Sequence, residues 1–518
     1  MTDIAREISL LLRRGRIGEA ETLGGRIIGA RPDSAEAWVL AARIAQHRGD
    51  FAAMLERARR ARILDGRNMI ARLQEAEALV ATGQAQAARA QLAELEGLGE
   101  GDVAILLDAA NLYTHAGLYE DAARCCEKAA GLDPADPKAH YNHAAALIAL
   151  GRLDEATALL DRVIELDPHD YDAYYNRSTL KTQTRARNHI GEMEALVAAG
   201  LRHPRGLAPI GYALAKEYED IGDYEAAFAW LKRGADARRR GLSYDVAQDV
   251  ATMRAIAAVY DAAEMRRPVG GFPDAAPIFI LGLPRSGTTL VDRIISAHSQ
   301  AASLGEINDF ALAMVRLAGP VADKAALVRR SARIDFAELG RLYETGVRGR
   351  GRPERRLIDK TPANFLYIGL IVRALPNATI LHVRRNPMDS CYAMYKTLFR
   401  MGYPFSYDFD DLAAYYVAYR ELMDHWRRVA PGRIVDVDYE TLVTDQHGTT
   451  ARILEVCGLP WEDACLRFHE NASAAPTASA AQVRRPLYAT SVRKWRRYEK
   501  QLEPLRCRLE AAGIDVDS

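Results

Sequence analysis

The segment from Pro277 to Leu290 holds the residue types best suited to bind a charged ligand. A short apolar run is followed by the turn Gly282-Leu-Pro-Arg-Ser-Gly287, and a helical pattern begins at Thr288. A buried strand, a tight turn and a helix N-terminus form an anion cradle, because backbone N–H groups converge there and the helix dipole adds partial positive charge. The pattern therefore predicts a phosphate-binding loop.

This loop departs from the nucleoside-triphosphate pattern at one position. The spacing from Gly282 to Gly287 agrees with GxxxxGK[ST], but Thr288 stands where that pattern has lysine. Since this lysine normally reaches the β- and γ-phosphates, its replacement argues against ATP or GTP. It favours a ligand with one 5′ phosphate and a further group attached. The alternatives are a ligand-free strand-to-helix turn and a small-molecule kinase, which would need the missing lysine.

Four short runs in the second half of the chain predict β-strands, and each is followed by a helical pattern. They are Pro277–Leu281, Arg356–Ile358, Ala378–Val383 and Arg433–Val437. This alternation predicts a parallel sheet with helices on both faces and ligands at the carboxyl ends of the strands. Polar clusters are expected at those ends, namely 303–306, 359–362, 384–387 and 438–440, with a last cluster at 479–495.

The first half of the chain repeats itself. Glycines recur every 34 residues, and an alanine follows five residues after most of them. Glycine permits the tight turn between two helices, and a small residue lets those helices pack closely. The glycines are Gly15, Gly49, Gly83, Gly117 and Gly151, and the alanines are Ala20, Ala88, Ala122 and Ala156, with Met54 as the exception.

These repeats resemble the tetratricopeptide repeat, whose period is 34 residues. A sixth unit from Tyr171 is degenerate, and Gly222 recovers the pattern after a slip in phase. We expect about seven helix pairs ending near Gly241. Stacked pairs form a superhelix whose concave groove suits an acceptor peptide or protein. The alternative is a solenoid that only spaces or dimerises the chain.

Length and composition favour a multidomain globular protein. At 518 residues the chain is too long for one core, and 69 basic residues balance 69 acidic ones, so no global field favours nucleic acid. Six cysteines without metal-ligand spacing favour a reducing compartment. No signal-peptide order and no apolar run of about 20 residues is found, so we expect a cytoplasmic protein without a membrane span.

The predicted organisation has three parts. Residues 1–241 form an all-α tetratricopeptide-repeat solenoid, residues 242–275 a helical linker rich in proline and glycine near its end, and residues 276–518 an α/β domain with a P-loop-like turn and a central parallel sheet. The candidate chemistry lies in the third part.

Two motifs give this third part a specific resemblance. The loop Pro284-Arg-Ser-Gly-Thr-Thr289 and the motif Arg385-Asn-Pro-Met-Asp389 together resemble a sulfotransferase that uses 3′-phosphoadenosine 5′-phosphosulfate (PAPS). Within that superfamily the likeness is closest to tyrosylprotein sulfotransferases and to bacterial proteins that join tetratricopeptide repeats to such a domain. It covers roughly 277–498 and agrees with the missing lysine, since PAPS has no γ-phosphate.

The resemblance implies a set of nucleotide-binding residues. The loop would bind the 5′ phosphosulfate, and Arg385 and Lys494 would hold the 3′ phosphate, which also remains on the product 3′,5′-bisphosphate (PAP). Tyr439 would lie near the nucleotide, and the segment from Ser479 to Tyr488 would form a late cofactor loop. The full expected set is Arg285, Ser286, Gly287, Thr288, Thr289, Arg385, Tyr439, Ser479, Arg485, Tyr488 and Lys494.

The resemblance also implies catalytic roles for direct, in-line, metal-independent transfer. Glu306 stands 21 residues after Arg285 and would be the general base that takes the proton of the acceptor hydroxyl. Arg285 and Lys360 would offset the charge that develops on the sulfonate and the departing phosphate oxygen, and Ser479 would donate a hydrogen bond there. The alternatives are a helix-capping role for Glu306 and a solvated surface role for Lys360.

One position departs from the family pattern. The family has a serine eight residues after its 3′-phosphate arginine, but this chain has Ala393, so either Ser390 substitutes or the contact is lost. The acceptor stays open between a peptide tyrosine and the hydroxyl of a carbohydrate, lipid or small metabolite. A non-catalytic repeat scaffold with a relic nucleotide domain is the remaining alternative.

Overall fold

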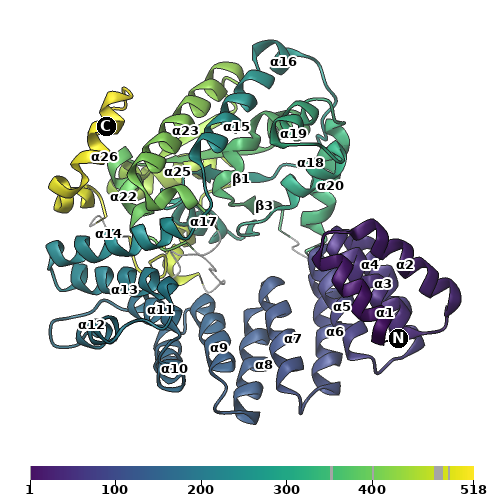
Figure 1. Cartoon of the computed structure of the whole chain (residues 1–518). Helices are drawn as coiled ribbons and strands as arrows, with labels where there is room; N and C mark the ends of the chain where they lie inside the picture. The colour runs from purple at the N-terminus through teal and green to yellow at the C-terminus, as the bar shows by residue number, and fades with distance from the viewer. Residues whose placement is uncertain (1, 351–353, 400–401, 472–481, 488–490, 518) are drawn as a thin grey trace. The chain divides into compact units, whose positions relative to one another are not determined.

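The computed structural model describes residues 2–350, 354–399, 402–471, 482–487 and 491–517. The chain divides into two compact units (Figure 1). The first is built mainly from Met1–Leu166, and the second from Asp167–Thr345 and the C-terminal part of the chain. The three predicted parts, 1–241, 242–275 and 276–518, were divided by sequence pattern and not by compactness. Their boundaries stay a prediction.

The first unit consists of helices that pack in consecutive pairs, α1 on α2 through α9 on α10 (Figure 1). The helices are α1 Thr2–Arg13, α2 Ile17–Ala30, α3 Ala35–Arg48, α4 Phe51–Leu64, α5 Met69–Ala81, α6 Ala85–Leu98, α7 Val103–His115, α8 Tyr119–Leu132, α9 Pro137–Leu150 and α10 Leu153–Leu166.

The periodic glycines lie in the turns inside these pairs, as the repeat predicts. Their φ angles are positive, 69° at Gly15, 76° at Gly49, 75° at Gly83, 75° at Gly117 and 81° at Gly151. A side chain at such an angle is strained, which explains the glycines. The residues five positions later are fully buried in the packing of each pair, namely Ala20, Met54, Ala88, Ala122 and Ala156.

The second unit begins with an irregular helix pair and a regular one. Between α11 and α12 the chain forms an isolated bridge from Thr184 to Arg187, and α11 packs on α13. α13 and α14 pack so closely that a Cβ built on Gly211 would lie 2.8 Å from the Cα of Gly234. The helices are α11 Tyr171–Leu180, α12 Ile190–Ala199, α13 Leu207–Asp220, α14 Tyr224–Arg240, α15 Val246–Val259 and α16 Ala262–Arg266.

A parallel sheet forms the core of the second unit, which confirms the predicted fold class. In the described part of the chain it has five strands in the order β2-β3-β1-β4-β5. They are β1 Ile278–Gly282, β2 Ala301–Ser303, β3 Arg356–Asp359, β4 Thr379–Arg384 and β5 Ile434–Asp438. Four of these match predicted strands to within a residue or two, and β2 is the strand that the sequence did not predict.

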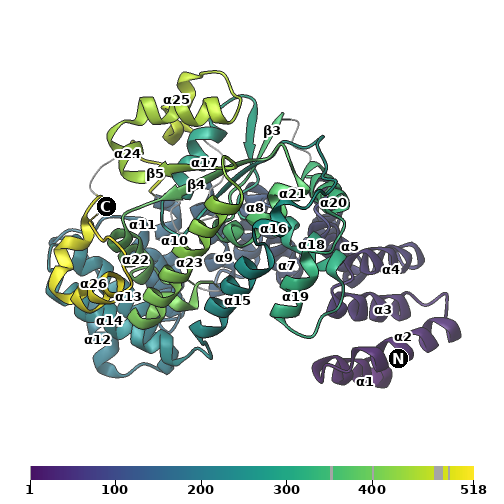
Figure 2. The same cartoon turned by 90° about the horizontal axis from the view of Figure 1, so that it is seen from above.

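Helices cover both faces of the sheet (Figure 2). Ile278 and Ile280 of β1 pack into the cluster of α17 and α25, whereas Phe279 points the other way and stacks on Tyr343 of α20, with ring centroids 5.5 Å apart. The helices are α17 Thr288–Ser296, α18 Asp309–Ala318, α19 Lys324–Ser331, α20 Phe336–Arg348, α21 Ile368–Ala374, α22 Pro387–Tyr395, α23 Phe409–Val429, α24 Tyr439–Thr444, α25 Gln446–Val456 and α26 Glu499–Ala511.

None of the helices in the described part of the chain combines the length and the apolar character needed to cross a bilayer. The cytoplasmic location stays a prediction.

Candidate functional site

Candidate site residues follow the carboxyl ends of all five strands. The glycine-rich loop follows β1, Glu306 comes shortly after β2, Lys360 directly after β3, Arg385 directly after β4 and Tyr439 directly after β5. Because the strands are parallel, their carboxyl ends all lie on the same side of the sheet. The sheet therefore brings together side chains that are far apart in the sequence.

The loop after β1 is tight enough to require glycine at both ends. Gly282 has a φ of 147°, and a Cβ there would lie 2.6 Å from the carbonyl oxygen of Val383. Gly287 has a φ of 110°, and its Cβ would lie 2.6 Å from Cδ2 of Tyr439. Arg285 between them adopts a φ of 67°. The turn then leads directly into α17, whose N-terminal N–H groups lack partners within the helix.

The unpaired hydroxyl of Ser286 indicates that this loop binds an anion. Ser286 is 2% exposed, and its Oγ has no hydrogen-bond partner in the part of the chain that the structure describes. Buried polar atoms are normally paired, so an unpaired hydroxyl beside a helix N-terminus fits a missing acceptor. A phosphate oxygen is an acceptor of this kind.

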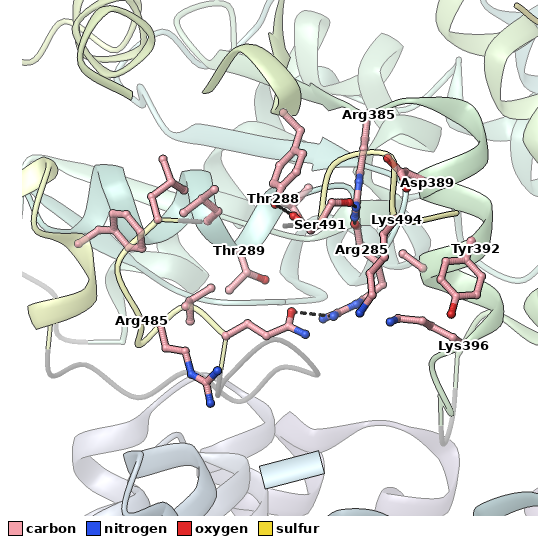
Figure 3. Close-up of a pocket in the computed structure, with 18 of the residues that line it drawn as sticks. Arg285, Thr288, Thr289, Arg385, Asp389, Tyr392, Lys396, Arg485, Ser491 and Lys494 are labelled. Carbon is pink, nitrogen blue, oxygen red and sulfur yellow. Dashed lines mark hydrogen bonds between the residues drawn. The ribbon is translucent and has the colours of Figure 1, made fainter. Parts of the chain in front are cut away.

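A pocket next to the loop is rich in positive charge (Figure 3). Thr288, Thr289 and Tyr439 line it together with Asp389 and Ser491. Its cationic side chains come from the loop, from the residues directly after β4 and α22, and from the C-terminal segment, and they are Arg285, Arg385, Lys396, Arg485 and Lys494. Such a cluster suits a ligand with more than one negative group.

Arg385 ties the loop to the C-terminal segment. Its Nη1 donates to the carbonyl of Arg285 at 3.0 Å, and its Nη2 donates to the carbonyl of Ser491 at 2.7 Å. Its guanidinium carbon lies 4.8 Å from the ring centroid of Tyr439, whose hydroxyl is 2.6 Å from Ser491 Oγ. Arg285 in turn donates from Nη2 to Gln482 Oε1 at 2.7 Å. These contacts fix the guanidinium of Arg385 at the pocket wall.

Asp389 positions Lys494. This carboxylate is 1% exposed and accepts from the backbone N–H groups of Arg493 at 2.5 Å and Trp495 at 3.1 Å. Lys494 begins the short 3₁₀ helix η6, Lys494–Tyr498, between these two contacts. Asp389 of α22, the helix that follows Arg385, thus fixes the backbone at residues 493–495.

Glu306 and Lys360 form an ion pair at the neighbouring strand ends. The Nζ of Lys360 donates to Oε1 of Glu306 at 2.5 Å, and the two side chains are 1% and 45% exposed, respectively. Their backbones run together beyond the sheet, since the N–H of Lys360 donates to the carbonyl of Gly305 at 3.0 Å. A buried ammonium therefore orients a carboxylate that solvent, and hence an acceptor, can reach.

Two carboxyl groups near Lys360 are perturbed by burial. Burial raises the pKa of Asp359 to about 7, although the Asn364 Nδ2 donates to it at 3.0 Å and the Tyr343 hydroxyl lies 3.4 Å away. Burial also raises the pKa of Asp292 on α17, against the opposing charge of Lys360. Asp359 and Asp292 are therefore shielded from solvent, whereas the carboxylate of Glu306 is not.

The structure leaves some predicted residues without a test. Ser479 and Tyr488 lie outside the described residues. Ser390 is buried on α22, and Ala393 rather than Ser390 lines the pocket. Among the described residues no cluster of three or more His, Cys, Asp or Glu side chains is suited to a metal ion, and metal independence stays a prediction.

Sequence reasoning missed Lys396, Asp389 and Ser491 as pocket residues. Lys396 follows Ala393 by three residues, so helical spacing places both on one side of α22, and this signal was available. Asp389 belongs to the motif that begins at Arg385, but its contacts run to a segment about a hundred residues later, which no local pattern indicates.

Comparison with known proteins matches two parts of the chain to family models. Residues 277–463 match the model of the sulfotransferase family, and residues 113–182 match that of the tetratricopeptide repeat. An uncharacterized protein of Aquifex aeolicus (strain VF5) is 33% identical over 312 residues, which span 58% of this chain and 41% of that protein. A protein-tyrosine sulfotransferase of Drosophila melanogaster is 24% identical over 242 residues, or 42% of this chain and 46% of that protein.

The chain thus spans less than half the length of these two curated relatives. Among solved structures, the sulfotransferase domain of the Synechococcus PCC 7002 olefin synthase is 20% identical and covers 45% of this chain and 90% of that domain, with a TM-score of 0.33.

Proposed function

We propose that this chain, which joins tetratricopeptide repeats to a sulfotransferase-family domain, moves a sulfonate group from PAPS to an acceptor hydroxyl. The observation that carries the proposal is that two sites lie together at the carboxyl ends of the strands. A lysine-free phosphate loop lies beside a cationic pocket, and the ion pair of Glu306 and Lys360 follows the two adjacent strands. The first suits a bisphosphate nucleotide without a γ-phosphate, and the second suits proton removal.

The chain's own residues divide the binding of the nucleotide between them. The loop amides and the Ser286 hydroxyl receive the 5′ phosphate, and the guanidinium of Arg385 with Lys494 receives the 3′ phosphate. In the family pattern a serine hydroxyl stands at the position of Ala393. In this chain Lys396 adds an ammonium on the same side of α22 as Ala393. Arg485 and Tyr439 complete the walls, and Ser479 and Tyr488 belong to the proposed binding segment by resemblance.

The transfer step uses Glu306 and Lys360. When bound, PAPS supplies an activated sulfonate. The carboxylate of Glu306 takes the proton of the acceptor hydroxyl, and its ion pair with Lys360 holds it in one orientation. The buried ammonium of Lys360 and the guanidinium of Arg285 offset negative charge that grows during the transfer. Ser479 assists by resemblance.

We propose a tyrosine side chain in a peptide or protein as the acceptor. The similarity to protein-tyrosine sulfotransferases supports this choice, and the helical repeats offer a surface of the kind that holds extended peptides. Glu306 is exposed enough to meet a side chain presented from outside.

Calorimetric titration with PAP, AMP and ATP tests the nucleotide assignment. The wild-type chain is expected to bind PAP more tightly than AMP and ATP. Arg385→Ala should remove the advantage of PAP over AMP, which lacks the 3′ phosphate. Arg384→Ala is the matched control, because Arg384 pairs instead with Asp438 at 2.6 Å. Equal affinity of the wild type for PAP and AMP would refute the proposal.

Transfer of labelled sulfonate from PAPS to tyrosine peptides tests the chemistry. Glu306→Gln keeps the shape of the side chain but cannot take a proton, so transfer should be lost while PAP affinity is retained. Transfer at the wild-type rate in this variant would remove Glu306 from the reaction.

A further inference from the structure

A carboxylate from the repeat-like helices meets two pocket lysines. Glu219 lies near the end of α13, and its Oε1 accepts from Lys494 Nζ and, at 3.0 Å, from Lys396 Nζ. Its Oε2 accepts from the hydroxyls of Tyr392 at 2.6 Å and Tyr498 at 3.1 Å. Both oxygens are thus saturated by donors from α22 and from the C-terminal segment.

This cluster is charged although it is shielded from solvent. The Glu219 side chain is 13% exposed, and those of Lys396 and Lys494 are 27% and 26% exposed. Burial disfavours the charged carboxylate, but Lys396 and Lys494 outweigh burial and hold the pKa of Glu219 well below its usual range. Two ammonium groups share one carboxylate, so one net positive charge remains at the pocket wall.

A second contact fixes the helix that carries Glu219. The hydroxyl of Tyr212, also on α13, is buried and donates to the backbone carbonyl of Tyr395 at 2.9 Å. Tyr395 ends α22 and directly precedes Lys396. The helix pair of α13 and α14 therefore contacts α22 at the point where Lys396 leaves the helix.

We propose that Glu219 is a positioning residue of the nucleotide pocket, through which the last repeat-like helix pair holds Lys396 and Lys494 together where the 3′ phosphate binds. The inference rests on the proposed binding of PAP and PAPS. A lysine that pairs only with solvent would lose side-chain entropy on binding phosphate, whereas these two are already ordered. By linkage, anything that displaces α13 also changes nucleotide affinity.

The charge on Lys396 depends on this carboxylate. Burial lowers the pKa of Lys396 to about 8, Glu219 opposes that effect and Lys494 adds to it. Among the described residues, the phenols of Tyr392 and Tyr498 also face the cluster. Without the carboxylate, burial and Lys494 act unopposed, so Lys396 loses its proton at a lower pH than in the wild type.

Titrations of PAP and AMP between pH 7 and pH 9 test this role, because phosphate groups are fully ionised over most of that range. Wild-type affinity for PAP should fall as the pH rises through about 8, while affinity for AMP stays level. In Glu219→Gln the two lysines lose the acceptor that orders them, so PAP should bind about 10-fold more weakly at pH 7 and its fall should shift to lower pH, while AMP binds as before. Lys396→Arg should abolish the fall, since arginine stays charged.

Controls separate this role from a purely structural one. Glu225→Gln changes an exposed carboxylate of α14 and should leave both profiles unchanged. A Glu219→Gln profile identical to wild type, or an equal loss for PAP and AMP at every pH, overturns the role of Glu219. A wild-type protein that does not distinguish PAP from AMP instead overturns the proposed function, so the two failures are distinguishable.

Discussion

Asp359→Asn should change how stability depends on pH. The buried carboxyl of Asp359 has a pKa of about 7 in the folded chain, against about 4 in an unfolded one. Between these values the folded state binds a proton that the unfolded state does not. Stability therefore falls as the pH rises from about 4 to about 7 and levels off above. An asparagine does not titrate, so residue 359 of the variant adds nothing to the pH dependence of stability.

The size of this effect follows from the two pKa values. A difference of about three pH units corresponds to about 4 kcal/mol, which is an upper limit because the surroundings relax around a charged carboxylate. At pH 5 the variant and wild type should be similarly stable, since asparagine keeps a carbonyl oxygen for Asn364 Nδ2. At pH 8 the variant should be the more stable, with a thermal midpoint higher by several degrees.

Thermal unfolding of the full chain at several values of pH provides the assay. Asp274→Asn, a change of an exposed carboxylate before β1, is the control and should run parallel to wild type. Parallel curves for Asp359→Asn and wild type between pH 5 and pH 8 would refute the argument, because they would mean that Asp359 is ionised throughout this range.

Further predictions concern the loop and the ion pair. Gly287→Ala should weaken PAP binding by tenfold or more, because its Cβ would meet the ring of Tyr439. Gly432 has a φ of 75° and open space around it, so Gly432→Ala should lower stability alone. Equal PAP affinity in both variants would contradict the steric argument. Lys360→Gln should lower the transfer rate about a hundredfold or more with little change in PAP affinity, as single-turnover assays would show, and an unchanged rate would remove Lys360 from catalysis. Tyr439→Phe should loosen the Ser491 contact and weaken PAP binding a few-fold by calorimetry; wild-type affinity would make that hydrogen bond irrelevant to the pocket.

Local backbone chemistry made much of the architecture predictable. The glycines at 34-residue spacing mark turns because a left-handed φ favours glycine wherever it occurs, and the loop after β1 is recognisable for the same reason. β2 was missed because Ala301–Ser303 is short and lacks β-branched residues. It becomes a strand through pairing with β3, and a sequence window does not contain that partner.

The candidate site was predictable where one segment carries its own chemistry or where two residues follow adjacent strands. The pairing of Glu306 with Lys360 follows from the parallel sheet, because residues after adjacent strands lie close together. The meeting of Glu219 with Lys396 joins residues separated by 177 positions, through side chains whose types are ordinary for helix surfaces. Only the packing of α13 against α22 determines that contact, and no local sequence pattern indicates which helices pack together.

A crystal structure of the chain soaked with PAP tests the central claim most directly. We expect the 5′ phosphate against the loop at 286–289 and the 3′ phosphate beside the guanidinium of Arg385. Nucleotide bound elsewhere, or a 3′ phosphate that points away from Arg385 into solvent, would contradict it.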